Sequence, residues 1–165
     1  MTYRYFAYGS NLDPEHFAAW CREHEYEGLA LEGGQAAVLD DYELRLAVPS
    51  KYWMGSVGTL EPRIGAQVYG ALFEVPDEHA DKIRHKEGVA TGLYQEIDVE
   101  VHLWTPGDAD VTIQLLPARA FIAAEGRVAP SPPPPSERWL DTVARGAAAQ
   151  GLPATWIEEL RGKRK

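Results

Sequence analysis

The stretch Ile97-Asp-Val-Glu-Val-His-Leu103 alternates apolar and polar residues at every position. Successive side chains of a β-strand point to opposite faces, so this alternation predicts a strand with one face in the core and the other in water. The turn residues Thr105-Pro-Gly-Asp108 follow, and then a second apolar run from Val111 to Leu116. We therefore expect a β-hairpin in this part of the chain.

Further strands are expected on both sides of this hairpin. Each is a short run of apolar and β-branched or aromatic residues, and glycine- or proline-bearing turns separate them. The runs are Tyr3 to Tyr8, Tyr42 to Val48, Ser56 to Leu60 and Gln67 to Val75. Such a succession of strands with few helices favours an α+β fold, with a small, mixed but mostly antiparallel β-barrel and flanking helices.

Helix start and stop signals lie between and after the strands. Asp13 as N-cap and Pro14 in the first turn predict a helix whose core face carries Cys21. A short helix is expected over Pro76 to Lys86, with Ala80 and Ile83 inward and Gly88 as its stop. Another should run from the cap Ser136 to Gly151, and a final amphipathic turn should follow Pro153.

Length and charge narrow the function classes. The chain has 165 residues, a net charge of −9 and one cysteine, which suits one soluble globular domain over residues 1–165. The acidic balance argues against nucleic acid and anionic membranes as partners. The single cysteine favours a reducing, cytoplasmic setting, and neither a secretory leader nor a membrane helix is expected. A monomer or a homodimer fits equally well.

Several common chemical signatures are absent from the sequence. There is no phosphate loop, no dinucleotide fingerprint, no nucleophile elbow and no zinc-protease motif. The five histidines form no helical i, i+4 ligand pair, so surface or satisfied core histidines are favoured over a metal site. Cys21, between Phe17 and Trp20 on a helix, is expected to pack rather than to act as a nucleophile. No cofactor and no metal are expected.

The segment Pro130 to Pro135 holds five prolines in six positions and must run extended. It is either a stiff connector or a ligand for a proline-binding domain. The connector is favoured because the helix signal at Ser136 follows at once.

Two segments are harder to explain as scaffold. The first, Tyr5-Phe-Ala-Tyr-Gly-Ser-Asn-Leu12, ends a strand in a glycine-containing loop just before a helix, where free backbone amides can bind a carboxylate or an oxyanion. The alternative is an ordinary tight turn. The second, His85 to Tyr94, places Glu87 at the end of a helix beside Gly88. Glu87 is either an exposed glutamate or a general base with a pKa raised by burial in a pocket.

At these residues the chain resembles the γ-glutamylcyclotransferase family, in the branch that acts on γ-glutamyl amino acids. The resemblance spans most of the chain. It is carried by the YGSNL loop (Tyr8 to Leu12), Trp53 to Leu60, the EGVxxGxY stretch (Glu87 to Tyr94), Ala129-Pro130 with the proline run, and Gly151 to Pro153. Cyclotransferases that degrade glutathione are related but usually carry a YGSL opening motif.

The resemblance implies a small mixed barrel whose cavity binds a γ-glutamyl group and releases 5-oxoproline and an amine. It implies that Glu87 is the catalytic glutamate and that Tyr94 lines the same pocket. The residues that match the glutamyl-binding loop are Tyr8, Gly9, Ser10, Asn11 and Leu12. A tyrosine that some members carry before the proline run falls near Gly126 here, which implies a different amine side of the pocket.

This chemistry needs little from the protein. The substrate supplies its own attacking amine, so folding the substrate and moving one proton are the main tasks. Glu87 could take the proton from the amine and return it to the leaving nitrogen, without metal or cofactor. Three alternatives remain: removal of a γ-glutamyl protecting group from a natural-product amine, a non-catalytic module for glutamyl or carboxylate ligands, and a scaffold that presents the proline run.

Overall fold

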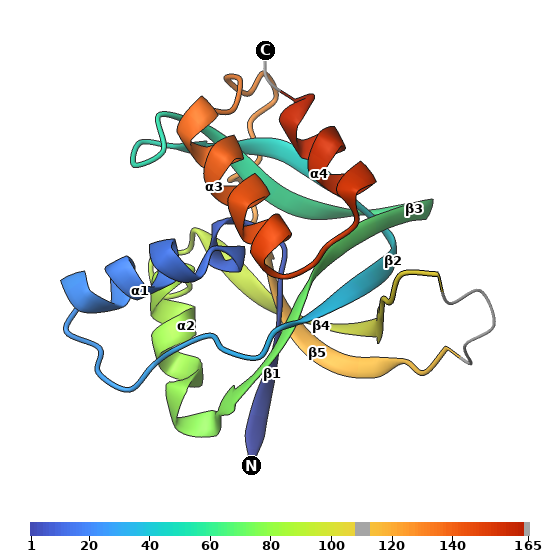
Figure 1. Cartoon of the computed structure of the whole chain (residues 1–165). Helices are drawn as coiled ribbons and strands as arrows, with labels where there is room; N and C mark the ends of the chain where they lie inside the picture. Colours follow the sequence, from blue (N-terminus) through green and yellow to red (C-terminus); the bar gives the residue numbers. More distant parts are fainter. Residues whose placement is uncertain (108–112, 164–165) are drawn as a thin grey trace.

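Five strands close into a barrel in the order β1-β3-β2-β4-β5 (Figure 1). The computed structural model describes residues 1–107 and 113–163. Neighbouring strands pair antiparallel except β1 and β5, which are parallel. The predicted α+β, mostly antiparallel barrel is therefore confirmed. The strands are β1 (Thr2–Ala7), β2 (Gln35–Ser50), β3 (Gly55–Pro76), β4 (Tyr94–Leu103) and β5 (Leu116–Ala123).

Helices cover two sides of this barrel. Figure 1 shows α3 and α4 lying against each other on one side, and α1 and α2 together on another. Short 3₁₀ turns lead into α1 and α2. The helical elements are η1 (Ser10–Leu12), α1 (Pro14–Glu23), η2 (Asp77–His79), α2 (Ala80–Lys86), α3 (Glu137–Ala149) and α4 (Ala154–Arg161). The expected helices are all present, and Cys21, Ala80 and Ile83 are buried as expected.

Two predicted strands, Ser56 to Leu60 and Gln67 to Val75, are parts of one long strand, β3. The separation was wrong because the glycine between them does not end the strand. Gly65 adopts a left-handed conformation opposite a register shift in β2, and its amide donates to Asp41 Oδ1 at 2.9 Å. A β-bulge of this kind bends a strand without interrupting it.

The predicted strand from Val111 to Leu116 is also corrected. The strand that pairs with β4 begins at Leu116 and continues to Ala123, while residues 113–115 are not in a strand. Val111 and the turn residue Asp108 lie outside the described residues. Pro117 lies inside the strand and pairs with Glu100 of β4. Among the described residues, the only register pair between β5 and β1 is Arg119 with Tyr5. Proline is tolerated where a strand has no neighbour on its amide side.

The two predicted helix caps differ in their chemistry. Ser136 Oγ accepts from the amide of Trp139 at 3.2 Å, which is the expected side-chain cap. Asp13 stands at the N-cap position of α1, but its carboxylate makes no capping hydrogen bond. It accepts instead from Arg145 Nη2 at 2.6 Å, so Asp13 attaches the start of α1 to α3.

The proline run connects the barrel to α3. The carbonyl of Pro134 accepts from the amide of Ser56 at 3.3 Å, at the start of β3. A Cβ on Gly55 would lie 2.6 Å from that same carbonyl oxygen, so the run packs directly on the strand. The run therefore has a structural role as a connector.

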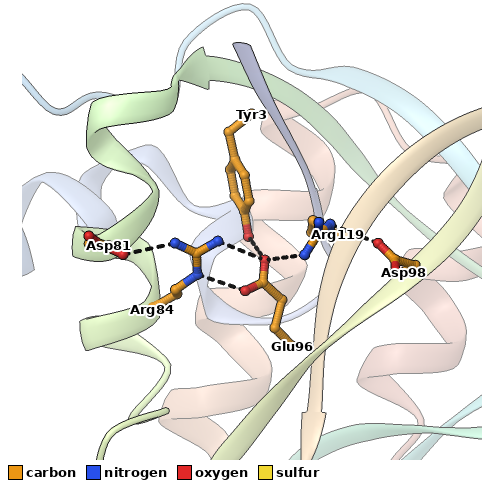
Figure 2. A network of polar contacts seen from close by, with 6 residues as sticks. All are labelled: Tyr3, Asp81, Arg84, Glu96, Asp98 and Arg119. Atoms are coloured by element: carbon orange, nitrogen blue, oxygen red, sulfur yellow. Dashed lines mark hydrogen bonds and ion pairs between the residues drawn. The ribbon is translucent and has the colours of Figure 1, made fainter. Parts of the chain in front are cut away.

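A polar network fastens α2 to the barrel (Figure 2). Glu96 of β4 accepts from Arg84 of α2 at 2.7 Å, from Tyr3 of β1 at 2.7 Å and from Arg119 of β5 at 3.2 Å. Arg84 also bonds Asp81, and Arg119 pairs with Asp98. The Glu96 carboxylate thus joins α2 to three strands. Because α2 is held in this way, the position of Glu87, the residue after the helix, is also fixed.

Candidate active site

A cavity of about 640 Å³ lies at the end of the barrel where β1 leads into η1 and where α2 leads into β4. Its inner wall consists of buried aromatic residues, and its outer wall comes from α1 and the turn between β2 and β3. The inner residues are Tyr5, Tyr8, Tyr94, Phe121 and Trp139. The outer residues include His16, Trp20, His24, Tyr52 and Trp53. The cavity therefore has a closed inner end and an open outer end.

Glu87 lines the inner part of this cavity and is held by two side chains. Tyr5 Oη donates to Glu87 Oε1 at 3.0 Å, and Asn11 Nδ2 donates to the same oxygen at 2.9 Å. Asn11 Nδ2 also donates to Tyr5 Oη at 2.8 Å. Tyr5 and Asn11 are only 3% and 4% exposed. The three groups form a closed triangle that fixes the carboxylate.

This triangle leaves the second carboxylate oxygen available. Within residues 1–107 and 113–163, both hydrogen bonds of the Glu87 carboxylate are made by Oε1. Burial raises the pKa of Glu87, and the Lys86 charge and the Tyr5 hydrogen bond only partly offset that rise. A carboxylate with a raised pKa and one available oxygen is a good candidate for reversible proton transfer.

The turn after α2 explains why Glu87 occupies this place. Glu87 is the C-cap of α2, and its amide donates to the carbonyl of Ile83 at 3.0 Å. Gly88 follows with a φ of 70°, and a Cβ there would lie 3.0 Å from Leu93 Cβ. Only glycine adopts this left-handed position without strain, so Gly88 ends the helix and turns the chain towards Tyr94.

The two tyrosines that the sequence singled out line the same cavity. Tyr8 Oη donates to the carbonyl of Phe121, and Tyr94 Oη donates to the carbonyl of Gly58 at 2.6 Å. Burial raises the pKa of both phenols far above the physiological range. Both therefore stay protonated and shape the inner wall.

The loop from Gly9 to Leu12 is divided between cavity and core. Gly9, Ser10 and Asn11 line the cavity. Among the described residues the amides of Ser10 and Asn11 have no hydrogen-bond acceptor, whereas Leu12 donates to the carbonyl of Gly9 at 3.0 Å. Leu12 is fully buried and does not line the cavity. The structure therefore brings four of the five predicted loop residues, together with Glu87 and Tyr94, into one site.

Two features of the site were not expected from the sequence. Tyr5 lies in the quoted stretch, but both faces of β1 are buried from Tyr5 to Ala7, so strand alternation alone could not show which face meets the cavity. Lys86 and His16 also line the cavity. The hydrogen bond between the Lys86 ammonium group and the His16 ring joins α2 to α1, although the two residues are 70 positions apart in the chain. No local sequence pattern predicts such a contact.

No metal centre is evident in the part of the chain that the structure describes. Histidine, cysteine and carboxylate side chains there do not gather in groups of three or more that could hold an ion. The residues of the cavity instead offer phenols, imidazoles, an amide, two carboxylates and two ammonium groups.

Comparison with known proteins decides the family. Residues 67–160 match the AIG2-like family. The chain belongs to this family. The γ-glutamylcyclotransferases of Homo sapiens and Mus musculus are 27% and 25% identical to it, and each alignment covers 97% of this chain and 78% of the relative. A solved γ-glutamyl cyclotransferase has the same fold with a TM-score of 0.78 and 23% identity, over 98% of this chain and 87% of that one.

The family match covers one of the two segments that form the site. Residues 67–160 include α2, Glu87 and Tyr94 but not the loop from Tyr8 to Leu12. The alignments with the two curated relatives extend over both segments of this AIG2-like chain.

In the ranges 1–107 and 113–163, none of the helices combines the length and the apolar composition needed to span a bilayer.

Proposed function

We propose that this chain is a γ-glutamylcyclotransferase, which closes a γ-glutamyl group onto its own α-amine and releases 5-oxoproline and a free amine. The observation that carries the proposal is the Glu87 carboxylate, which is held by Oε1 within a cavity while no residue in the ranges 1–107 and 113–163 bonds Oε2. The curated relatives named γ-glutamylcyclotransferase support the same activity. The reaction is a lyase-type cleavage that uses no water.

The proposed binding mode follows from the donors and acceptors that the cavity leaves unused. The amides of Ser10 and Asn11 are unused donors in the cavity lining, so the α-carboxylate of the glutamyl group is the ligand that suits them. Asn11 Oδ1 is buried without a partner among the described residues, and a buried acceptor of this kind is costly unless a ligand supplies a donor. The α-amine of the substrate is such a donor, and it would then lie beside Glu87.

Glu87 moves one proton in this mechanism. Its Oε2 accepts a proton from the attacking α-amine as the new carbon–nitrogen bond forms at the γ-carbonyl carbon. The same proton is then given to the leaving nitrogen as the old carbon–nitrogen bond breaks, so the departing group leaves as a neutral amine. Holding amine and carbonyl together in a five-membered-ring geometry can be worth effective molarities on the order of 10⁵ M.

Incubation of the purified protein with γ-glutamyl-alanine tests the proposal, with 5-oxoproline measured by mass spectrometry. The Glu87→Gln variant should remain folded and lose about 10²- to 10⁴-fold in kcat, the usual contribution of a general acid–base group. Glu100→Gln, a change of the same kind at an exposed position of β4, is the matched control and should retain full activity. Binding of γ-glutamyl-alanine without turnover by the wild-type chain would instead identify a non-catalytic glutamyl-binding module.

A further inference from the structure

The outer wall of the active-site cavity has a second cavity behind it. The turn between β2 and β3, residues 51–54, supplies Tyr52 and Trp53 to this wall, and His16 of α1 lies beside them. The same three residues line a cavity of about 420 Å³ between α1 and α3. A side chain with space on both sides lacks the close packing that holds a core residue in one position. Another contact must therefore keep this wall in place.

Arg138, near the start of α3, contacts the turn from the side of the second cavity. Its guanidinium carbon lies 4.9 Å from the centre of the Tyr52 ring and 4.8 Å from that of Trp53. Arg138 Nη2 also donates a hydrogen bond to the carbonyl of Tyr52. A planar guanidinium group can stack on aromatic rings and donate a directed hydrogen bond, and a lysine ammonium group has no such plane. One side chain thus fixes two rings and the backbone of the turn.

The backbone of the turn ends in an unfavourable conformation. Met54 has a φ of 60°, and its side chain is 83% exposed. A left-handed conformation costs free energy in a residue other than glycine, and an exposed side chain offers little packing to offset it. The chain is fixed again at Gly55, where a Cβ would lie 2.6 Å from the carbonyl oxygen of Pro134. The turn therefore depends on contacts outside itself to keep its position.

Arg138 lies on the far side of this wall from the substrate. It lines the second cavity and not the cavity that contains Glu87. Any effect that Arg138 has on catalysis must therefore pass through the residues of the wall, Tyr52 and Trp53. A wall held in place excludes water from the cavity and completes the surface that a substrate contacts.

We propose that Arg138 is a positioning residue, which holds residues 51–54 against the outer end of the active-site cavity and keeps the wall out of the second cavity. The effect on catalysis rests on the proposed function, whereas the contact itself does not. Without Arg138 the wall moves into the second cavity in part of the molecules. A substrate that needs the closed wall then binds only the remaining fraction, so its apparent affinity falls in proportion.

Arg138→Ala removes the stacking and the hydrogen bond at an exposed position of α3, where alanine favours the helix. KM for γ-glutamyl-alanine should rise about three- to thirtyfold, the combined value of exposed cation–π contacts and one hydrogen bond. The kcat value should stay unchanged, because bound substrate meets the same Glu87. Arg161→Ala, at an exposed position of α4, is the matched control and should leave KM unchanged.

Arg138→Lys separates the stacking from the charge. If Arg138 only attracted an anionic substrate to this acidic chain, lysine would restore the wild-type KM. If Arg138 holds the turn, most of the rise in KM should remain, because lysine lacks the planar group.

Trypsin cleavage after Lys51 measures the position of the turn without any substrate. Lys51 is exposed at the start of the turn, and proteolysis follows the population in which the chain is locally open. Arg138→Ala should speed cleavage between Lys51 and Tyr52 by about the same three- to thirtyfold factor. Cleavage after Arg63, an exposed residue further along β3, is the internal control and should keep its rate.

The outcomes separate this inference from the proposed function. An unchanged KM in Arg138→Ala, or a wild-type KM in Arg138→Lys, would overturn the inference. An unchanged cleavage rate after Lys51 would overturn it too, and so would an equal rise after Arg63, which would indicate a general loss of stability. If the wild-type chain does not turn over γ-glutamyl-alanine, the proposed function fails, and the cleavage rates still decide whether Arg138 holds the turn.

Discussion

The two oxygens of the Glu87 carboxylate are in different environments. Oε1 accepts from Tyr5 and from Asn11, and no described residue bonds Oε2. Hydrogen bonds to a carboxylate favour its ionised form, while burial favours the protonated form. Because burial is the larger effect, the pKa of Glu87 is raised although the Lys86 charge and the Tyr5 hydrogen bond lower it. Tyr5 therefore adjusts the strength of the base as well as its orientation.

Tyr5→Phe tests this adjustment. Loss of the phenol removes a hydrogen bond that lowers the pKa of Glu87, so the pKa should rise and the acid limb of the kcat/KM profile should move to higher pH. At neutral pH we expect about a two- to tenfold loss of kcat/KM, the value of one ordinary hydrogen bond. Tyr42→Phe is the matched control, because Tyr42 is a half-buried tyrosine of β2 that lies outside the cavity lining. An acid limb that stays in place would show that Tyr5 does not act through Glu87.

At the scale of the element, α2 is short and is held mainly by its side chains. It spans only Ala80–Lys86, and isolated helices of this length are unstable in water. Arg84, in its middle, is fixed to the barrel through Glu96 (Figure 2). Ile83, on the inner face of the same helix, is fully buried. The position of the carboxylate at the end of α2 therefore depends on a network that does not touch the cavity.

Glu96→Gln should loosen this attachment. We expect a loss of about 1–2 kcal/mol in the free energy of unfolding at pH 7, measured by urea denaturation, because the hydrogen bonds from Arg84 and Arg119 lose their charged acceptor. Asp98→Asn removes the exposed carboxylate that pairs with Arg119 and should cost less than about 0.5 kcal/mol. Equal losses in the two variants would mean that Glu96 contributes no more than a surface pair.

The same variant has a defined pH dependence. Burial alone would raise the pKa of Glu96, but the hydrogen bonds from Arg84 and Tyr3 and the charges of Arg84 and Arg119 outweigh it and lower the pKa. A carboxyl group whose pKa is lower in the folded state stabilises the protein above its unfolded pKa of roughly 4.3. That stabilisation is lost as the pH falls through the folded-state pKa. The difference between wild type and Glu96→Gln should therefore shrink below about pH 4.

A second element, α3, touches the site loop at a glycine. A Cβ on Gly146 would lie 2.4 Å from the amide nitrogen of Asp13 and 2.5 Å from the carbonyl carbon of Leu12. Alanine is a better helix former than glycine by about 1 kcal/mol, so helix propensity alone predicts that Gly146→Ala stabilises the protein. The backbone of η1 has no room to move away from α3 without shifting Asn11, so packing predicts the opposite.

We expect packing to decide the outcome for Gly146→Ala. Overpacking usually costs about 1–3 kcal/mol, so the melting temperature should fall, and kcat/KM should fall with it as Asn11 shifts. Ala148→Gly, at an exposed position of the same helix, measures propensity alone and should cost about 1 kcal/mol without affecting kcat/KM. A more stable and fully active Gly146→Ala variant would show that α3 does not position the loop.

At the scale of the whole molecule, sequence patterns predicted the elements better than their contacts. Alternation predicted the barrel, and the helix signals at Pro14 and Ser136 were accurate because caps and breakers act locally. The bulge at Gly65 and the strand through Pro117 were missed because each depends on the pairing partner across the sheet. In the site, Glu87 and Tyr94 lie in one motif and could be found, while Tyr5 and Lys86 depend on the closure of the barrel and the approach of α1 to α2.

Burial of Glu87 also has a cost for the stability of the whole protein. A carboxyl group whose pKa is higher in the folded state favours folding when it is protonated, and this advantage is lost as the pH rises through the folded-state pKa. At neutral pH, which lies above the unfolded-state pKa of a glutamate, the raised pKa of Glu87 therefore opposes folding. Glu87→Gln keeps the shape and an acceptor for Tyr5 and Asn11 without the charge, so its free energy of unfolding at pH 7 should exceed that of the wild type.

The gain in Glu87→Gln should disappear as the pH falls below the unfolded-state pKa of a glutamate, roughly 4.3, where the wild-type carboxyl group is neutral in both states. Urea denaturation of both proteins between pH 4 and pH 8, on the order of one measurement per pH unit, would show this convergence. Glu100→Gln, on the exposed face of β4, should show no such gain at pH 7. If Glu87→Gln is less stable than the wild type at pH 7, the buried carboxylate is compensated within the free protein, and the site does not hold a base whose proton affinity is raised by its surroundings.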